Sequence, residues 1–253
     1  MNVSIITPAH NAAHYIRETL EAILKQTHKE WELLITDDAS TDDTCRIVEE
    51  YMQKDDRIRL FRLHKNLGPA GARNNSVKNA KGRFIAFCDS DDIWTPDKLD
   101  KQIEFMLANG YAFTYAPYHI VSEEGDLIDT VLPRNKVNYR DLLRTCDIGC
   151  LTAVYDTSIT GKVYMLPLWN KEDYALWLQL LKKVDYAYCC NEPLGYYRLR
   201  HNSISSNKLR TLKYLWQVYY QVEKLSFLKS AYFCLVYTLH GIKKYGKPRY
   251  WRK

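Results

Sequence analysis

The first 110 residues alternate short apolar runs with predicted helices, and this alternation limits the possible folds more than any other feature. The apolar runs cover residues 3–7, 31–36, 58–63 and 84–88, and a helical segment follows each of them. Strands that alternate with helices along a chain form a parallel sheet covered by helices. We therefore predict an α/β fold with a mostly parallel central sheet flanked by helices.

Polar and acidic side chains follow three of these predicted strands. In chain order they are Pro8, Ala9 and Asn11, then Asp37 and Asp38, then Asp89, Ser90 and Asp91. Ligands of open α/β sheets bind at the carboxyl ends of the strands. We therefore expect these residues to share one binding site.

The acidic run that begins at Asp89 has the pattern of a metal site. Carboxylates two residues apart after a strand can point into one cleft, and carboxylate oxygens suit Mg²⁺ or Mn²⁺, which also bind phosphate oxygens. A solvated loop is the alternative. The apolar run at 84–88 leads directly into Asp89 and Asp91, which favours the buried site.

The pair Asp37 and Asp38 is open to two interpretations. One carboxylate can accept a hydrogen bond from a nucleobase N–H, which would favour uracil or thymine. Alternatively, Asp38 or Ser40 caps the next helix. In the same way, Asn11 is a candidate cap for the helix that follows the first strand.

The segment 66–74 enters a helix and contains Gly68, Gly71 and Arg73. Helix N-termini attract phosphate through free N–H groups and the helix dipole, and an arginine can clamp a diphosphate. The alternative is that the glycines serve turn geometry only. This segment is therefore a candidate phosphate site.

Two further groups lie in the second half of the chain. Asp173, with Glu172 beside it, opens a predicted helix, where a carboxylate can act as a general base or simply complement the helix dipole. His201 follows in a polar stretch, where it can contact a metal or phosphate, or be a solvated loop residue. Residues 150–155 are predicted to form a strand.

Taken in this order, the motifs resemble the family 2 inverting glycosyltransferases of the GT-A fold. The resemblance covers roughly residues 1–205 and departs from the family pattern at His10, where tyrosine is frequent, and at Ala39, where glycine is frequent. The matching segments are residues 5–11, 33–42, 66–74, 88–92, 171–178 and 197–201.

The resemblance implies a Rossmann-like nucleotide-binding half (1–110) and an acceptor half (111–206). It also implies transfer of a hexose or N-acetylhexosamine from a nucleotide-sugar, with UDP preferred by family habit, to a hydroxyl of a glycan or lipid-diphosphate-linked acceptor in cell-surface polysaccharide synthesis. Asp173 would be the catalytic base and Glu172 its support. Asp91, Asp89 and His201 would hold Mn²⁺ or Mg²⁺. The donor would meet Pro8, Ala9, Asn11, Asp37, Asp38, Gly71, Arg73, Asp89 and Ser90.

The segment 207–253 differs from the rest of the chain in charge. It carries eleven Lys or Arg and a single acid, Glu223, whereas the whole chain has a net charge of +6. Its apolar and aromatic residues recur at helical spacing, so we predict a basic amphipathic helical tail. An anionic membrane surface is the expected partner, packing against the body is the alternative, and no nucleic-acid-binding module is recognisable.

Other sequence features bear on location. No basic leader precedes the first strand, no apolar run is long enough to span a bilayer, and the seven cysteines have irregular spacing. We expect a reducing, cytoplasmic location, peripheral on the inner face of the cell membrane. A zinc site at Cys146, Cys150, Cys189 and Cys190 is the weaker alternative for the thiols.

Two other functions remain open at the level of sequence. A phosphatase of the haloacid dehalogenase type also places a DxD motif after a strand, but normally after the first strand of the domain rather than the fourth. A nucleotide-sugar-binding module without turnover is the second alternative, and the acidic pair at Asp173 argues against it.

Overall fold

The computed structural model describes residues 3–199 and 208–245. Its centre is an eight-stranded sheet in the order β3-β2-β1-β4-β10-β6-β11-β9. The first four of these strands are parallel and come from the first half of the chain: β1 (Val3–Ala9), β2 (Trp31–Asp37), β3 (Ile58–Arg62) and β4 (Phe84–Phe87).

The other half of the sheet is mixed. Its strands are β6 (Phe113–Tyr115), β9 (Lys136–Val137), β10 (Val154–Asp156) and β11 (Ala187–Cys189). Strand β10 runs antiparallel to both β4 and β6, β11 runs parallel to β6, and β9 runs antiparallel to β11. The predicted mostly parallel central sheet is confirmed.

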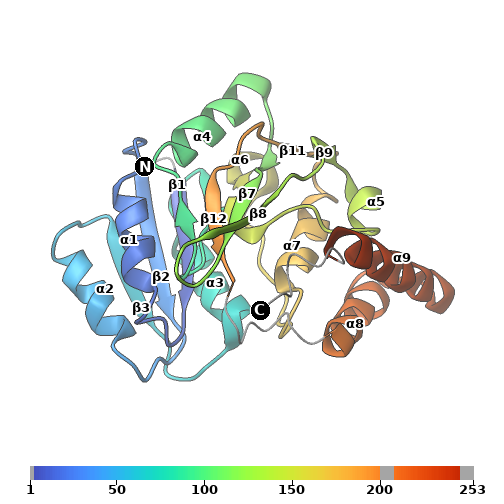
Figure 1. Cartoon of the computed structure of the whole chain (residues 1–253), viewed down its shortest axis with the longest axis horizontal. Helices are drawn as coiled ribbons and strands as arrows, with labels where there is room; N and C mark the ends of the chain where they lie inside the picture. Colours follow the sequence, from blue (N-terminus) through green and yellow to red (C-terminus); the bar gives the residue numbers. More distant parts are fainter. Residues whose placement is uncertain (1–2, 200–207, 246–253) are drawn as a thin grey trace.

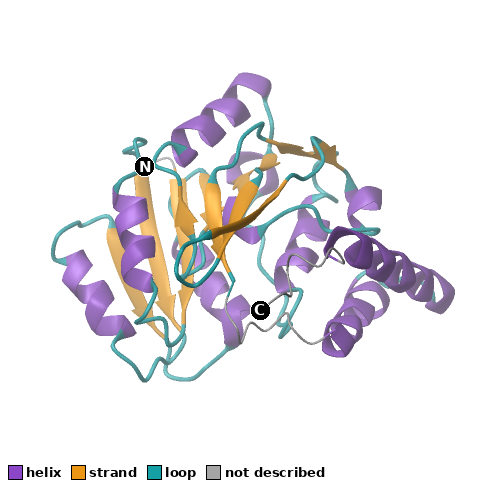
Figure 2. Ribbon diagram, viewed as in Figure 1, coloured by secondary structure: helices purple, strands orange, loops and turns teal. Residues whose placement is uncertain are grey.

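A second, four-stranded sheet was not predicted. Its order is β5-β12-β7-β8, and Figure 2 shows it in front of the central sheet. Its strands are β5 (Ile93–Trp94), β7 (Tyr118–Val121), β8 (Leu127–Val131) and β12 (Gly195–Arg198). Since β5 follows the acidic run at Asp89 and pairs with β12, this sheet ties the acidic loop to the segment Gly195–Arg198.

Helices cover both faces of the central sheet (Figure 1). On one face, α1 (Ile16–Leu24), α2 (Thr44–Met52) and α4 (Lys98–Asn109) pack on side chains such as Ile5 and Leu33. On the other face, α3 (Gly68–Asn79) and α7 (Glu172–Leu180) pack on Ile6 and Leu34. Neighbouring residues of one strand thus face two different cores, as a strand with both faces buried requires.

The remaining elements are short or lie at the C-terminal end. The short ones are α5 (Tyr139–Leu142), η1 (Cys150–Thr152) and α6 (Thr157–Thr160). The chain then forms α8 (Lys208–Trp216), the π-helical η3 (Gln217–Val222) and α9 (Phe227–Tyr245), which lie at the end of the molecule opposite α2 (Figure 1). The predicted helical character of the tail is confirmed. Among the described helices, none combines the length and apolar character needed to cross a bilayer.

Two local predictions are wrong. Asn11 does not cap α1, because Tyr15 occupies the N-cap and makes no side-chain cap hydrogen bond. Instead Asn11, with a positive φ of 48°, accepts a hydrogen bond from the backbone N–H of Thr41 at 2.9 Å. Residues 150–155 are not one strand, since η1 precedes β10.

Helix α7 is fixed to the sheet by Trp177. This side chain is fully buried, and its ring centroid lies 5.5 Å from that of Phe87 in β4 and 5.5 Å from that of Phe113 in β6. Because β4 leads into the acidic run at Asp89, one indole sets the position of α7 relative to that loop.

Replacing Trp177 by alanine is expected to lower the free energy of unfolding by about 3–5 kcal/mol, the usual cost of removing a buried tryptophan. Urea denaturation measures this loss. Trp177→Phe is the matched control and should cost clearly less, because it keeps an aromatic ring. The Trp177→Phe change also breaks no hydrogen bond, because the indole N–H has no partner among the described residues. Equal costs for the two variants would contradict this role of the indole.

Candidate active site

The polar segments that follow β1, β2 and β4 meet at one edge of the sheet. Ala9 and Asp37 are register partners at the ends of β1 and β2, and the backbone N–H of Asp38 donates to the Ala9 carbonyl at 2.8 Å. On the other side of β1, the N–H of Cys88 donates to the carbonyl of Ile6 at 3.1 Å. This arrangement places the acidic run from Asp89 beside the loop after β1, as the sequence predicted.

Asp37 and Asp38 organise the loops around this edge, and both are buried. Asp38 accepts a hydrogen bond from the backbone N–H of Leu67 at 2.6 Å, so it anchors the start of the segment that leads into α3. Asp37 accepts from the N–H of Ser40 at 3.1 Å. The turn from Asp38 to Ser40 needs a residue with left-handed backbone. Ala39 occupies it with a φ of 60°, which explains why glycine suits this position.

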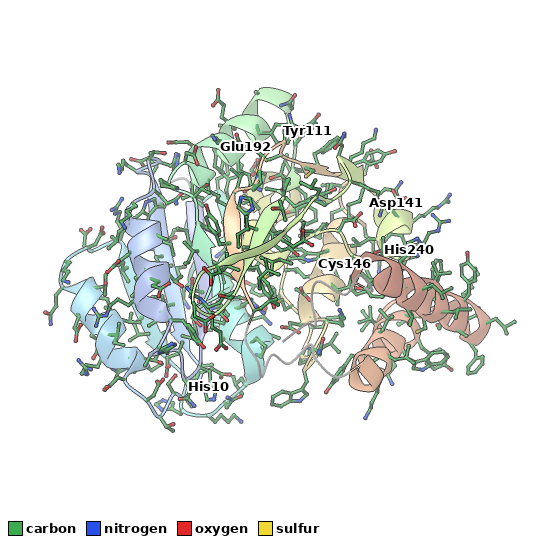
Figure 3. All side chains as sticks on the ribbon, viewed as in Figure 1. His10, Tyr111, Asp141, Cys146, Glu192 and His240 are labelled. Atoms are coloured by element: carbon green, nitrogen blue, oxygen red, sulfur yellow. The ribbon has the colours of Figure 1, made fainter. Side chains whose placement is uncertain are left out.

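His10, in the loop after β1, contacts both the loop after β2 and the segment that leads into α3; Figure 3 labels its position. Its Nδ1 lies 2.9 Å from the Asp38 carbonyl oxygen, and its Nε2 lies 3.4 Å from the side-chain amide of Asn66. The imidazole therefore stands where the tyrosine of the family pattern is frequent and holds two loops of the predicted nucleotide pocket together.

The start of α3 depends on its glycines. Gly68 has a φ of +75°, and a Cβ at Gly71 would lie 2.5 Å from the Cβ of Leu67, closer than side-chain atoms approach one another. Glycine at both positions therefore serves local geometry. Gly68 is buried and its backbone N–H donates to Asn66 Oδ1 at 3.1 Å, and the phosphate contact of this segment stays a prediction.

Arg73, on α3, joins the two acidic motifs of the chain. Its guanidinium donates to Asp89 Oδ1 at 2.6 Å and to Glu172 Oε1 at 3.0 Å. The Arg73 side chain is only 6% exposed, so these ion pairs are shielded from water. Burial alone would lower the pKa of Arg73, but the negative groups around it, Asp89 first, raise this pKa well above its usual range.

This bridge brings together residues that are far apart in the sequence. Asp89 follows β4, whereas Glu172 begins α7, and one guanidinium contacts both. The predicted contact of Arg73 with a diphosphate stays a prediction. In this structure its fork-shaped donor group is already used by two carboxylates.

The acidic run contains one carboxyl unlike the others. Asp92 is buried, and burial together with Asp91 and Asp89 raises its pKa well above the usual range. Its Oδ1 has no hydrogen-bond partner within the described residues, which fits a protonated carboxyl. Asp92 thus favours the neutral form, while Asp91 and Ser90 stay partly accessible on the same loop.

The start of α7 faces this loop. Lys171 occupies the N-cap with a φ of 66°, and Glu172 and Asp173 fill the first turn. Burial raises the pKa of Glu172, and Arg73 opposes that rise. Asp173 is half-buried and its Oδ1 accepts the backbone N–H of Tyr174 at 2.7 Å, so the carboxylate has a fixed orientation.

The half-buried Cys150 has a thiol whose pKa is influenced by both motifs. Burial raises its pKa well above the usual range, Arg73 opposes this, and both Asp89 and Asp173 raise it further. The Cys150 thiol is therefore within electrostatic range of a carboxylate from each acidic motif. Sequence reasoning missed Cys150, because nothing in its spacing marks it.

Other predicted site residues are placed as follows. Pro8 and Ala9 end β1, and Asn11 is exposed in the loop after it. His201 lies outside the described residues. Within the described part of the chain, no three His, Cys, Asp or Glu side chains form a ready-made metal site.

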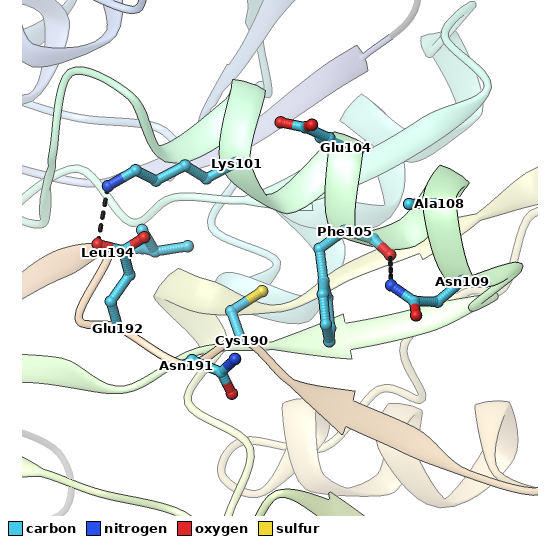
Figure 4. A pocket seen from close by; sticks show the side chains of 9 residues that line it. All are labelled: Lys101, Glu104, Phe105, Ala108, Asn109, Cys190, Asn191, Glu192 and Leu194. Carbon is cyan, nitrogen blue, oxygen red and sulfur yellow. Dashed lines mark hydrogen bonds and ion pairs between the residues drawn. The ribbon is translucent and has the colours of Figure 1, made fainter.

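A separate pocket of about 310 Å³ lies between α4 and the segment after β11 (Figure 4). No predicted site residue lines it, so it is distinct from the carboxylate site. Its described lining residues are Lys101, Glu104, Phe105, Ala108, Asn109, Cys190, Asn191, Glu192 and Leu194.

Comparison with solved structures agrees with this architecture. TarS of S. aureus (residues 1–349, in complex with UDP-GlcNAc) superposes with a TM-score of 0.74 at 23% identity, covering 92% of this chain and 70% of that one. The mannosyltransferase PcManGT of Pyrobaculum calidifontis, in complex with GDP-Man and Mn²⁺, gives a TM-score of 0.68 at 17% identity, covering 89% and 65%. At these identities the likeness shows the GT-A fold.

Sequence comparison goes further. The chain is 42% identical over 243 residues to TuaG of Bacillus subtilis, which carries the name of a teichuronic acid biosynthesis glycosyltransferase, and the match covers 96% of both chains. It is 43% identical over 245 residues to WfgD of Escherichia coli, named a UDP-Glc:α-D-GlcNAc-diphosphoundecaprenol β-1,3-glucosyltransferase, covering 96% and 95%. The family model described as glycosyl transferase family 2 matches residues 4–162. The chain therefore belongs to glycosyl transferase family 2.

Proposed function

We propose that this glycosyltransferase moves a hexose or N-acetylhexosamine from a UDP-sugar to a hydroxyl of a lipid-diphosphate-linked or glycan acceptor in cell-surface polysaccharide synthesis, with inversion at the anomeric carbon. The names of WfgD and of WfaP, which is 42% identical over 213 residues, support a UDP-linked donor and a lipid-diphosphate acceptor. The observation that carries the mechanism is the Arg73 bridge between Asp89 and Glu172.

In this mechanism Asp173 is the general base. The acceptor oxygen attacks the anomeric carbon, the bond from that carbon to the diphosphate oxygen breaks, and the hydroxyl proton passes to the Asp173 carboxylate. Attack from the side opposite the diphosphate inverts the configuration. Glu172 acts as a positioning residue, because it contacts Arg73 and through it the loop that carries Asp89.

The acidic loop suits a divalent metal that the donor helps to bind. Mg²⁺ is usually held by one or two carboxylates plus substrate phosphates rather than by a cage of protein ligands. Asp91, with Asp89 beside it, supplies such a pair, and His201 would add to it. When bound, the ion stabilises negative charge on the leaving diphosphate.

The experiment that tests the function is transfer to a synthetic acceptor. The chain is incubated with UDP-glucose, UDP-N-acetylglucosamine or UDP-galactose, Mn²⁺ and a lipid-diphosphate-linked N-acetylglucosamine. Products are identified by mass spectrometry, and their anomeric configuration is assigned by NMR. A glycosylated acceptor with a β linkage supports the proposal. Release of inorganic phosphate would indicate a phosphatase, and donor binding without turnover an inert binding module. Either result would overturn it.

Removing divalent metal with EDTA is expected to lower turnover at least about 10²-fold, because the ion contributes several kcal/mol to stabilising the leaving group. Added Mn²⁺ or Mg²⁺ should restore it. Asp91→Asn should raise the metal concentration needed for half-maximal turnover, whereas Asp43→Asn, at an exposed carboxylate, should not change it. Full activity in EDTA would show that the acidic loop has another role.

A further inference from the structure

The outer side of α9 carries a row of large apolar side chains that face solvent. Leu228 is 79% exposed, and the others are between 55% and 60% exposed. Their spacing of four, three and four residues puts them on one side of a helix. We call this row, made of Leu228, Tyr232, Leu235 and Leu239, the outer stripe of α9.

The opposite side of α9 accounts for its packing on the body. Cys234 belongs to the main core, the Phe233 ring lies 5.8 Å from that of Tyr219, and the Tyr237 ring lies 5.6 Å from that of Tyr174 in α7. The helix is therefore apolar on two sides, and folding uses only one. Something other than the described body must cover the outer stripe to remove it from water.

The charges beside the outer stripe are positive. Lys224 and Lys229 are exposed, and Lys229 is next to Leu228 in the chain. The single acid of the tail, Glu223, is turned inward: its carboxylate binds Lys182 Nζ at 2.6 Å and the Tyr139 hydroxyl at 2.5 Å. Its side chain is only 1% exposed, so the described tail surface offers cations without a competing carboxylate.

We infer that the outer stripe of α9 docks on an anionic lipid bilayer, with the helix lying in the plane of the interface. An interfacial helix buries an apolar face at the boundary of headgroups and acyl chains while nearby lysines meet anionic headgroups. A second copy of this chain is a poorer occupant, because two surfaces with the same positive charge repel each other.

The docking surface is connected to the catalytic helix. Lys171, which precedes Glu172, has its Nζ 3.5 Å from the Tyr237 hydroxyl, and the Tyr174 and Tyr219 hydroxyls lie 3.0 Å apart. A bilayer under the outer stripe would thus hold α7 at a set height above the lipid. This consequence rests on the proposed lipid-linked acceptor, whereas the docking itself does not require it.

The test is co-sedimentation of the full chain with vesicles in the absence of donor and acceptor. The wild type should bind vesicles of phosphatidylcholine mixed with phosphatidylglycerol, and bind those of phosphatidylcholine alone more weakly. A triple variant, Leu228→Ser, Leu235→Ser and Leu239→Ser, should lower the partition coefficient at least about tenfold, because three apolar anchors are lost. The control is the triple variant Leu127→Ser, Leu132→Ser and Ile159→Ser, which removes residues that are 63%, 75% and 56% exposed on other elements.

The control variant should bind vesicles as the wild type does. Circular dichroism checks that both variants fold, and turnover with a water-soluble acceptor should be unchanged in both. A wild type that stays in the supernatant with anionic vesicles would overturn the inference, and so would equal binding by the stripe variant. If the wild type formed a dimer and did not bind vesicles, and the stripe variant alone were monomeric, the outer stripe would instead be an interface with a second copy of the chain. Failure of transfer to a soluble acceptor would instead count against the proposed function alone.

Discussion

Replacing Asp173 by asparagine is expected to lower kcat by about 10²–10⁴-fold, the usual contribution of a positioned general base. The amide has nearly the shape of the carboxylate, and its oxygen can still accept the backbone N–H of Tyr174, which lies 2.7 Å from Asp173 Oδ1. We therefore expect the fold and the affinity for UDP-sugar to survive. Turnover assays and calorimetric titration of donor measure the two effects separately.

The matched control for Asp173→Asn is Asp185→Asn, which makes the same change at an exposed carboxylate beyond the far end of α7. It should leave kcat and donor affinity unchanged. If Asp173→Asn lost donor binding and turnover to the same extent, the carboxylate would be structural. If it kept full turnover, the base would be another group.

Arg73→Met should lower the free energy of unfolding by about 3–5 kcal/mol, because it leaves two largely buried carboxylates without their counterion. The Asp89 and Glu172 side chains that it pairs with are 29% and 11% exposed. Urea denaturation measures the loss. Arg17→Met is the control, since Arg17 pairs with Glu50 on the surface, where both side chains are exposed and a pair contributes about 0–1 kcal/mol.

The cost of Arg73→Met should depend on pH in a defined direction. Burial raises the pKa of Glu172 and Arg73 opposes that rise, so the variant has a still higher Glu172 pKa in the folded state than the wild type. A carboxyl whose folded pKa lies above its unfolded value contributes most stability below the unfolded value and loses it as pH rises through the folded value. The difference between variant and wild type should therefore shrink as pH falls towards the ordinary glutamate range. A difference that is independent of pH would contradict the ion-pair role.

The sequence could predict the sheet and the edge where the candidate site lies, because alternating strands and helices leave few topologies and the carboxyl ends of parallel strands converge. It could not predict the second sheet, since strands as short as β5, with two residues, carry no usable periodicity. It also could not predict the partners of Arg73. A helix N-terminus suggested phosphate, whereas the contact with Glu172 joins residues 99 positions apart and depends on tertiary packing.

The tail shows a similar limit. Apolar residues recur at helical spacing on both sides of α9, so the sequence indicated helices but left membrane binding and packing as alternatives. The structure shows that Cys234 and Tyr237 pack on the body while Leu228 and Leu235 face solvent. The two interpretations apply to opposite sides of one helix, with packing observed and membrane docking proposed.

The most direct test of the account is a crystal structure of the chain with an unreactive UDP-sugar analogue and Mn²⁺. We predict that the diphosphate lies against the Asp89–Asp91 loop and that the Asp173 carboxylate faces the anomeric carbon from the side opposite the diphosphate. A nucleotide bound away from this loop, or a sugar turned so that Asp173 cannot reach an incoming hydroxyl, would contradict the claim that the two acidic motifs form one active site.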